Sequence, residues 1–239
     1  MTALHLVLLP GMDGTGELFA PLEHALGQAV TVHRMRYPVD EPLDYAQLER
    51  WLRPRLPQEP FVLLGESFSG PLTIAIAVDP PPQLQGLILC CTFARSPSAL
   101  LTALHAPAAP AMAWLATRSW AAGLLGTALL GAYATRPLRQ RLDQALRQVA
   151  PQVLAQRMRA VARVDVMDQL SAVQLPMLAL TARDDRLVPR SAAQAMARAQ
   201  PGLQTLDLPG PHGLLQAAPE RCAQAIAQFC RSLNSAATA

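Results

Sequence analysis

Short apolar runs alternate with helical patterns along most of the 239 residues, and this alternation constrains the fold more than any other feature. Several runs are apolar throughout, which is typical of strands that are covered on both faces. The predicted strands are Leu4–Leu9, Val30–Met35, Phe61–Leu64, Leu84–Cys91, Met177–Thr181 and Leu203–Leu208. The predicted helices between and after them are Glu17–Leu26, Tyr45–Leu56, Pro71–Val78, Ser191–Ala199 and Pro219–Leu233.

This order predicts an α/β protein with a doubly wound, mainly parallel sheet of about six strands, because parallel strands need crossover connections. The alternation breaks once, since residues 95–175 contain no convincing strand and favour several helices. No linker interrupts the pattern, so we expect one domain with an insertion. The α/β core would comprise residues 1–94 and 176–239, and residues 95–175 would form an all-helical cap.

Composition argues against several classes of protein. Only 15% of residues are charged and the formal net charge is +3, which does not indicate a nucleic-acid partner. The four cysteines, Cys90, Cys91, Cys222 and Cys230, have spacings that fit neither a zinc site nor a disulfide framework. We therefore expect buried free thiols and no metal site.

Two apolar stretches raise the question of a membrane or a secretory signal. Residues 1–9 are apolar, but no basic segment precedes them and Pro10-Gly11 ends the run early, so a cytoplasmic protein is expected. Ala111–Tyr133 is long enough to span a bilayer, yet it contains Arg118 and several glycines. We interpret this stretch as part of an apolar cap and predict no transmembrane span.

Ser67 is the candidate nucleophile. Residues 61–78 read FVLLGESFSGPLTIAIAV, which predicts a strand, a tight turn of small residues and an apolar helix, with Ser67 at the turn. Such a turn projects a serine hydroxyl away from the sheet, and it needs small neighbours such as Gly65 and Ser69. The G-x-S-x-G pattern is incomplete, because Ser69 occupies the last position and Gly70 follows it. An ordinary capping serine at a helix start is the alternative.

A serine hydroxyl needs an adjacent base, usually a histidine held by a carboxylate. His212 stands in a Gly/Pro loop between the last predicted strand and the last helix, where ligands of parallel sheets bind. Asp184 and Asp185 follow the strand Met177–Thr181 at the same edge. This gives the order Ser, Asp, His along the chain, as in α/β hydrolases.

The backbone N–H groups of Met12 and Phe68 are the candidates for an oxyanion hole. Phe68 directly follows Ser67, and Met12 lies in the glycine-containing loop LLPGMDGTG after the first strand. A phosphate-binding loop is disfavoured, because the glycine spacing is not G-x-G-x-x-G and no lysine follows. The interpretation requires no cofactor.

With these residues assembled, the whole chain resembles the α/β-hydrolase superfamily, most of all small bacterial serine esterases with a helical cap. In that family the acid is commonly followed by two residues and then Val-Pro, a register that Val188-Pro189 satisfies for Asp185. The histidine often follows Gly-Pro, as His212 does. Pro10 departs from the family's commoner His-Gly opening. In general layout the chain also resembles pimeloyl-acyl carrier protein methyl ester carboxylesterases.

The resemblance implies a serine carboxylesterase that uses Ser67, His212 and Asp185 and forms an acyl-enzyme on a small-molecule or carrier-bound ester. The apolar character of the expected cap suggests an apolar acyl substrate. A thioesterase or acyltransferase using the same groups, and a binding protein of the same fold without turnover, are the alternatives. The insertion is basic, which suggests an acidic partner such as acyl carrier protein, although a solvated arginine face would give the same composition. Its arginines are Arg95, Arg118, Arg136, Arg139, Arg141, Arg147, Arg157, Arg159 and Arg163, against Asp143, Asp165 and Asp168.

Overall fold

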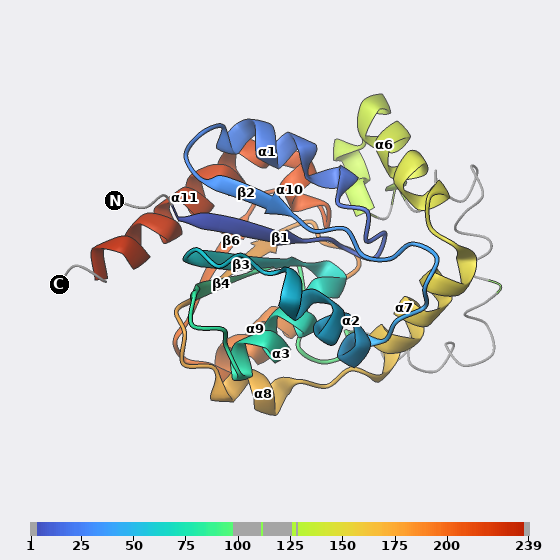
Figure 1. Cartoon of the computed structure of the whole chain (residues 1–239). Coiled ribbons are helices and arrows are strands. Elements are labelled where there is room, and N and C mark those ends of the chain that lie inside the picture. The colour runs from blue at the N-terminus through green and yellow to red at the C-terminus, as the bar shows by residue number, and fades with distance from the viewer. Residues whose placement is uncertain (1–3, 98–110, 112–125, 128, 237–239) are drawn as a thin grey trace.

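A computed structural model describes residues 4–97, 111, 126–127 and 129–236. Within these residues, six parallel strands form one sheet in the order β2-β1-β3-β4-β5-β6 (Figure 1). The predicted strands and the parallel α/β class are confirmed. The strands are β1 (His5–Leu9), β2 (Thr31–Arg34), β3 (Phe61–Glu66), β4 (Leu84–Cys90), β5 (Met177–Ala182) and β6 (Leu203–Leu208).

The central strands are buried on both faces, which explains their continuous apolar sequences. In β1, Leu6 and Leu8 point into one half of the core, while Val7 and Leu9 point into the other. All six residues of β3 are buried. The edge strands differ, since no residue of β2 is fully buried and most of β6 is exposed or half-buried. Alternate side chains of one strand therefore serve two separate helix layers.

Helices cover the two faces of the sheet (Figure 1). The first layer contains α1 (Ala20–Leu26), α10 (Leu214–Ala217) and α11 (Pro219–Ala236). The second layer contains α2 (Tyr45–Leu52), α3 (Gly70–Val78), α8 (Met167–Ala172) and α9 (Arg190–Ala199). Single 3₁₀ turns flank three of these helices at Glu17–Phe19, Arg53–Arg55 and Ser67–Ser69.

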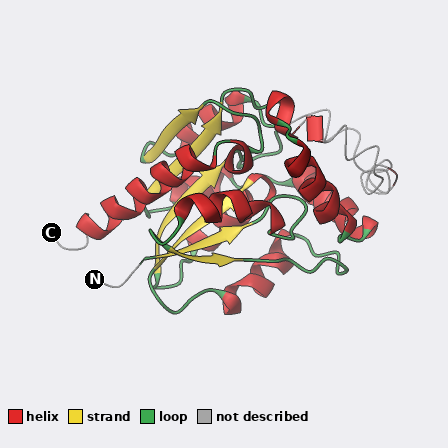
Figure 2. Ribbon diagram, turned by 90° about the horizontal axis from the view of Figure 1, so that it is seen from above, coloured by secondary structure: helices red, strands yellow, loops and turns green. Residues whose placement is uncertain are grey.

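The connection between β4 and β5 contributes two further described helices, α6 (Arg136–Arg147) and α7 (Pro151–Arg163), and a 3₁₀ turn at Gly131–Tyr133. Leu142 and Leu146 of α6 pack against Val153 and Leu154 of α7, forming a small third core cluster. Both helices lie beyond the carboxyl ends of the strands (Figures 1 and 2). By contrast α8, from the same connection, packs against α3 and α9 in the second layer. The insertion thus supplies α6 and α7, which lie beyond the carboxyl ends of the strands, and α8, which forms part of the second helix layer.

Most of Ala111–Tyr133, the stretch that resembles a membrane span, lies outside the described residues. In the part of the chain that the structure describes, no helix combines the length and apolar character needed to cross a bilayer. Cys90, Cys91, Cys222 and Cys230 are buried and free, as predicted.

Candidate active site

Three loops that follow sheet strands meet at one edge of the sheet. Because all strands are parallel, the loops after β3, β5 and β6 leave from the same edge. Strands β1 and β3 are neighbours with Leu9 opposite Gly65, and the chain moves in opposite directions from them along the sheet, to β2 and to β4. Such a switch point opens a crevice outside the carboxyl ends of the strands, where α/β proteins bind ligands.

Ser67 occupies a strained turn between β3 and α3. Its φ of 49° lies in the left-handed region, which few non-glycine residues adopt without support from their surroundings. Support comes from Thr92 after β4, whose hydroxyl donates to the Ser67 carbonyl. A Cβ on Gly65 would lie 2.8 Å from the Ser69 carbonyl oxygen, and one on Gly70 would lie 2.7 Å from the Thr92 Cβ. Gly65 and Gly70 therefore permit the sharp turn.

The structure brings Ser67, His212 and Asp185 into one chain of hydrogen bonds. His212 Nε2 lies 2.8 Å from Ser67 Oγ, and His212 Nδ1 lies 2.8 Å from Asp185 Oδ2. The side chains of His212 and Asp185 are 4% and 5% exposed, so water competes little for the bond between them. In this arrangement an imidazole can take the serine proton while the carboxylate holds its tautomer and orientation.

The adjacent aspartates are clearly distinguished. Besides meeting His212, Asp185 accepts hydrogen bonds at Oδ1 from the backbone N–H groups of Leu187 and Val188, each at 2.8 Å. These bonds fix the carboxylate within the turn after β5. Asp184 is exposed, and its carboxylate receives a long contact of 3.5 Å from the hydroxyl of Tyr133. The geometry thus places Asp185, and not Asp184, beside the imidazole.

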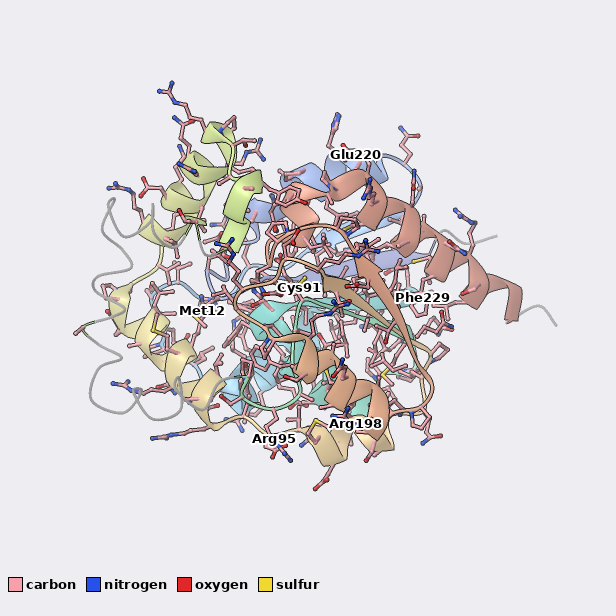
Figure 3. All side chains as sticks on the ribbon, turned by 180° about the vertical axis from the view of Figure 1, so that it is seen from behind. Met12, Cys91, Arg95, Arg198, Glu220 and Phe229 are labelled. Atoms are coloured by element: carbon pink, nitrogen blue, oxygen red, sulfur yellow. The ribbon has the colours of Figure 1, made fainter. Side chains whose placement is uncertain are left out.

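The loop after β1 lies beside Ser67, where the oxyanion hole was expected. A Cβ on Gly11 would lie 4.0 Å from the Cβ of Ser67, so the backbone next to Met12 lies against the serine. Met12 itself is half-buried between the main core and the cluster formed by α6 and α7 (Figure 3). Phe68 follows Ser67 in the 3₁₀ turn and is fully buried. Both predicted donors therefore belong to backbone segments that border Ser67.

Ser69, the residue that breaks the G-x-S-x-G pattern, connects the serine turn to the Met12 loop. Its hydroxyl donates to the Pro10 carbonyl, and the Tyr37 hydroxyl lies 2.6 Å from Ser69 Oγ. Burial raises the pKa of Tyr37 above its ordinary range, so the phenol stays protonated. A glycine at position 69 would remove this connection, while Gly70 already provides the close approach that the turn requires.

Glu66 is a buried acid that the sequence analysis did not single out. It directly precedes Ser67, accepts a hydrogen bond of 2.9 Å from the Gln216 amide, and receives another from the Gly11 backbone. Burial raises the pKa of its carboxyl group to about 7, with a further contribution from Asp13. A charged residue in an otherwise apolar strand sequence was the signal that could have identified it.

Arg157 corrects one expectation about the insertion. We expected the arginines of the insertion to form an exposed basic face, but Arg157 on α7 is only 2% exposed. Its guanidinium donates to the carbonyls of Met12 at 2.9 Å, Asp13 at 2.8 Å and Pro38 at 3.0 Å. The expectation was wrong for Arg157 because its side chain points inward to backbone acceptors.

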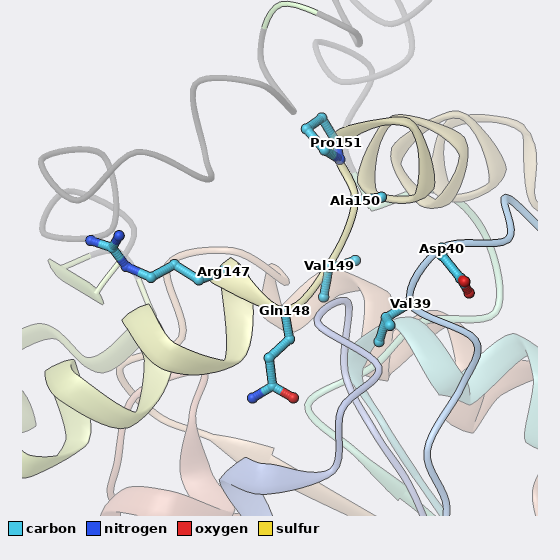
Figure 4. A pocket seen from close by; sticks show the side chains of 7 residues that line it. All are labelled: Val39, Asp40, Arg147, Gln148, Val149, Ala150 and Pro151. Atoms are coloured by element: carbon cyan, nitrogen blue, oxygen red, sulfur yellow. The ribbon is translucent and has the colours of Figure 1, made fainter.

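A surface hollow of about 480 Å³ lies where α6 passes into α7 (Figure 4). It is lined by Val39, Asp40, Arg147, Gln148, Val149, Ala150 and Pro151. Neither Ser67 nor His212 contributes to this lining, so the hollow is separate from the hydrogen-bonded chain described above.

Comparison with known proteins agrees with this architecture. A family model described as serine aminopeptidase, S33, matches residues 27–208. The structure is similar to a hydrolase from Pseudomonas aeruginosa PA01, with a TM-score of 0.80 and 20% identity over 95% of this chain and 90% of that chain. It is equally similar to a thermophilic esterase from Thermogutta terrifontis, with a TM-score of 0.80 and 24% identity over 97% and 91% of the two chains. Because both sequence identities are below 25%, these similarities establish the fold of the chain but not its activity.

One curated relative shares a shorter segment. Phytyl ester synthase 1, chloroplastic, of Arabidopsis thaliana is 38% identical over 79 residues, which is 30% of this chain and 11% of that protein. The family model, in contrast, spans well over half of the chain and includes both Ser67 and Asp185. The chain therefore belongs to the serine aminopeptidase S33 family of the α/β-hydrolase superfamily.

Proposed function

We propose that the protein is a serine carboxylesterase that works through an acyl-enzyme. The single observation that carries the proposal is the continuous hydrogen-bonded chain from Ser67 Oγ through His212 to Asp185 at the carboxyl edge of the sheet. The strained backbone of Ser67 supports the same role, because strain at a tight strand-to-helix turn exposes a nucleophile.

In the proposed reaction, Ser67 Oγ attacks the ester carbonyl carbon while His212 Nε2 takes its proton. The carbonyl oxygen becomes an oxyanion that the N–H groups of Met12 and Phe68 stabilise. His212 then protonates the leaving alcohol, and the acyl group remains on Ser67. A water molecule, deprotonated by His212, then attacks the carbonyl carbon of this acyl-enzyme. As the bond to Ser67 Oγ breaks, His212 gives the proton to Ser67 Oγ and the acid product is released.

A fluorophosphonate probe followed by a substrate panel tests this proposal. The protein should become labelled at Ser67 and should hydrolyse p-nitrophenyl acyl esters, and Ser67→Ala should do neither. The panel should also contain acyl thioesters and an aminoacyl p-nitroanilide, because the family is described by an aminopeptidase activity. Absence of labelling and turnover on every substrate would favour the alternative of a binding protein with this fold.

Acyl transfer is the second candidate, favoured by the segment shared with phytyl ester synthase. The same acyl-enzyme would then react with an alcohol in place of water, so Ser67 and His212 keep their roles. The two activities are separated by product analysis in the presence of a long-chain alcohol. Predominant ester formation at low alcohol concentration would identify a transferase, and free acid alone would identify a hydrolase.

We further propose that the basic side of α6 receives an acidic carrier, such as acyl carrier protein, when the substrate is carrier-bound. Arg136, Arg139, Arg141 and Arg147 are exposed, and Asp143 is the only acid of this helix. Asp143 pairs with Arg147 at 2.8 Å, which leaves an excess of positive charge toward the start of the helix. Arginine suits this task because its planar fork binds carboxylates and phosphates with two hydrogen bonds.

A further inference from the structure

The Met12 loop is held by a donor at each of five consecutive carbonyl groups. The Pro10 carbonyl accepts from the Ser69 hydroxyl, and the Gly11 carbonyl accepts from the Gly14 N–H at 3.0 Å. Arg157 binds the next two carbonyls, those of Met12 and Asp13, and the Tyr37 N–H donates to the Gly14 carbonyl at 2.8 Å. Because a bonded carbonyl fixes the plane of its peptide group, these bonds together set the direction of the N–H groups in the loop.

Arg157 is the one member of this set that comes from the insertion. It reaches Met12 and Asp13 from positions 145 and 144 residues away in the sequence, and α7 lies beyond the carboxyl ends of the strands (Figure 1). The start of α7 is attached to the same region, since the Ala150 N–H donates to the Val39 carbonyl at 2.8 Å. Helix α7 is therefore joined to the Met12 loop by the hydrogen bonds of Arg157 as well as by the apolar packing of Met12.

The residues around the guanidinium of Arg157 leave space for this group and accept its hydrogen bonds. A Cβ on Gly14 would lie 2.7 Å from the guanidinium carbon, so only a glycine leaves room for this group. The cation also lies 5.6 Å from the centroid of the Tyr37 ring and 6.0 Å from that of Phe68. Its three hydrogen-bond acceptors are backbone carbonyls, and a fork of fixed geometry can bind several carbonyls at once in a way that an ammonium group cannot.

We infer that Arg157 is a positioning residue for the oxyanion hole: by binding the carbonyls of Met12 and Asp13 it fixes the two peptide groups that directly follow the Gly11–Met12 peptide, and so keeps the loop in the shape in which the Met12 N–H faces the carbonyl that Ser67 attacks. The inference rests on the proposed hydrolytic function. Arg157 acts through the Met12 loop, so its effect belongs to the transition state, where the oxyanion forms, and not to binding of the ground-state ester.

The experiment compares Arg157→Met and Arg157→Lys with Arg163→Met, a matched control. Arg163 lies on the same helix but is exposed. The kcat and KM for a p-nitrophenyl ester are measured per active site, counted by fluorophosphonate titration, so that loss of folded protein does not count as loss of activity. The inhibition constant of an acyl trifluoromethyl ketone is measured in parallel, because its tetrahedral adduct places an oxyanion in the hole.

Removing an oxyanion donor costs 10²–10³ in kcat, and a displaced donor costs on the order of 10². We expect Arg157→Met to lower kcat about 100-fold with KM unchanged, and Arg157→Lys to lower it about 10-fold. The inhibition constant of the ketone should rise by the same factors, while Arg163→Met behaves as the wild type. If Arg157→Met does not fold, the kcat and the ketone inhibition constant of Arg157→Lys, which keeps the positive charge, test the inference instead.

Two outcomes would overturn the inference. Wild-type kcat in both Arg157 variants would show that the loop keeps its shape without the guanidinium. A rise in KM with kcat and ketone inhibition unchanged would place Arg157 in substrate binding instead. Failure of the proposed function itself has a different signature, because the wild-type protein would then show neither labelling nor turnover that depends on Ser67.

Discussion

The two backbone segments beside Ser67 are shaped in different ways. The turn at residues 65–70 has a local sequence pattern of small residues, with a buried strand before it and an apolar helix after it, and Thr92 adds one distant hydrogen bond. The loop at residues 10–15 depends on distant groups, namely Ser69, Tyr37 and Arg157. The turn at residues 65–70 can therefore be recognised from its sequence. The glycines of the loop at residues 10–15 are visible in the sequence too, but the conformation of this loop depends on residues far away in the chain.

The largest expected effect tests the segment with the local pattern. Ser67→Ala should lower kcat about 10⁶-fold, because the nucleophile is removed while the turn remains. His212→Ala should cost about as much, and the double variant should add little, since the two groups act as one unit. Steady-state hydrolysis of a p-nitrophenyl ester measures all three, with circular dichroism as the control for folding. Near-normal activity in Ser67→Ala would refute the assignment of the nucleophile.

The next effect tests the turn after β5, where two aspartates are adjacent. Asp185→Asn should lower kcat about 10⁴-fold, because the imidazole loses the charge that fixes its tautomer. Asp184→Asn, the matched control, should change kcat less than about twofold, since Asp184 is exposed and does not contact His212. The same ester assay measures both. The opposite ranking would invalidate the choice of Asp185.

The sequence was informative where chemistry follows a local pattern. The strands and the positions of Ser67 and His212 could be predicted, because both residues stand in loops of small residues next to apolar runs. Asp185 follows an apolar run as well, but its choice over Asp184 came from the Val188-Pro189 register of the family that the chain resembles. Arg157 could not be separated from Arg159 or Arg163 by composition alone. One signal was available: Val153, Leu154, Arg157 and Val161 share one helix face, so the arginine interrupts an apolar stripe. Its acceptors, however, are 119 to 145 residues away.

Glu66 lies in the turn at residues 65–70 and contacts Gly11 in the loop at residues 10–15. The raised pKa of its carboxyl group makes the stability of the protein depend on pH, which can be measured. Because its folded-state pKa is raised from 4.5 to about 7, the folded protein holds this proton more tightly than the unfolded chain. The stability that this gives is complete below pH 4.5 and is lost as pH rises through about 7. At 1.36 kcal/mol per pH unit the loss amounts to roughly 3 kcal/mol.

Glu66→Gln should abolish that loss, since an amide does not ionise and its oxygen can still accept the hydrogen bond from Gln216. Urea denaturation at pH 5 and pH 8 gives the free energy of unfolding for both proteins. We expect the wild type to lose more stability than the variant between these values. Equal losses would mean that the Glu66 carboxyl group ionises without cost in the folded protein.

The smallest effect concerns three exposed arginines of the insertion, in contrast to the buried Arg157. Reversing exposed Arg136, Arg139 and Arg141 to Glu should raise KM several-fold for a carrier-bound ester at low salt and leave a neutral p-nitrophenyl ester unaffected. The effect should fade at high salt, because exposed charges are screened within about 8 Å at physiological ionic strength. Stopped assays on both substrates at two salt concentrations measure it. Identical KM values on the carrier-bound ester would leave these arginines as a solvated surface.

The contact between Arg157 and the Met12 loop limits how freely the insertion can be exchanged. Grafting the segment between β4 and β5 from another hydrolase would change substrate access, but it would also delete a guanidinium on which the core loop relies. A chimera would need an arginine at the equivalent place on its own helix, or a loop that is stable without one. In evolution, the two segments should therefore change together, even though 144 residues separate Asp13 from Arg157 along the chain.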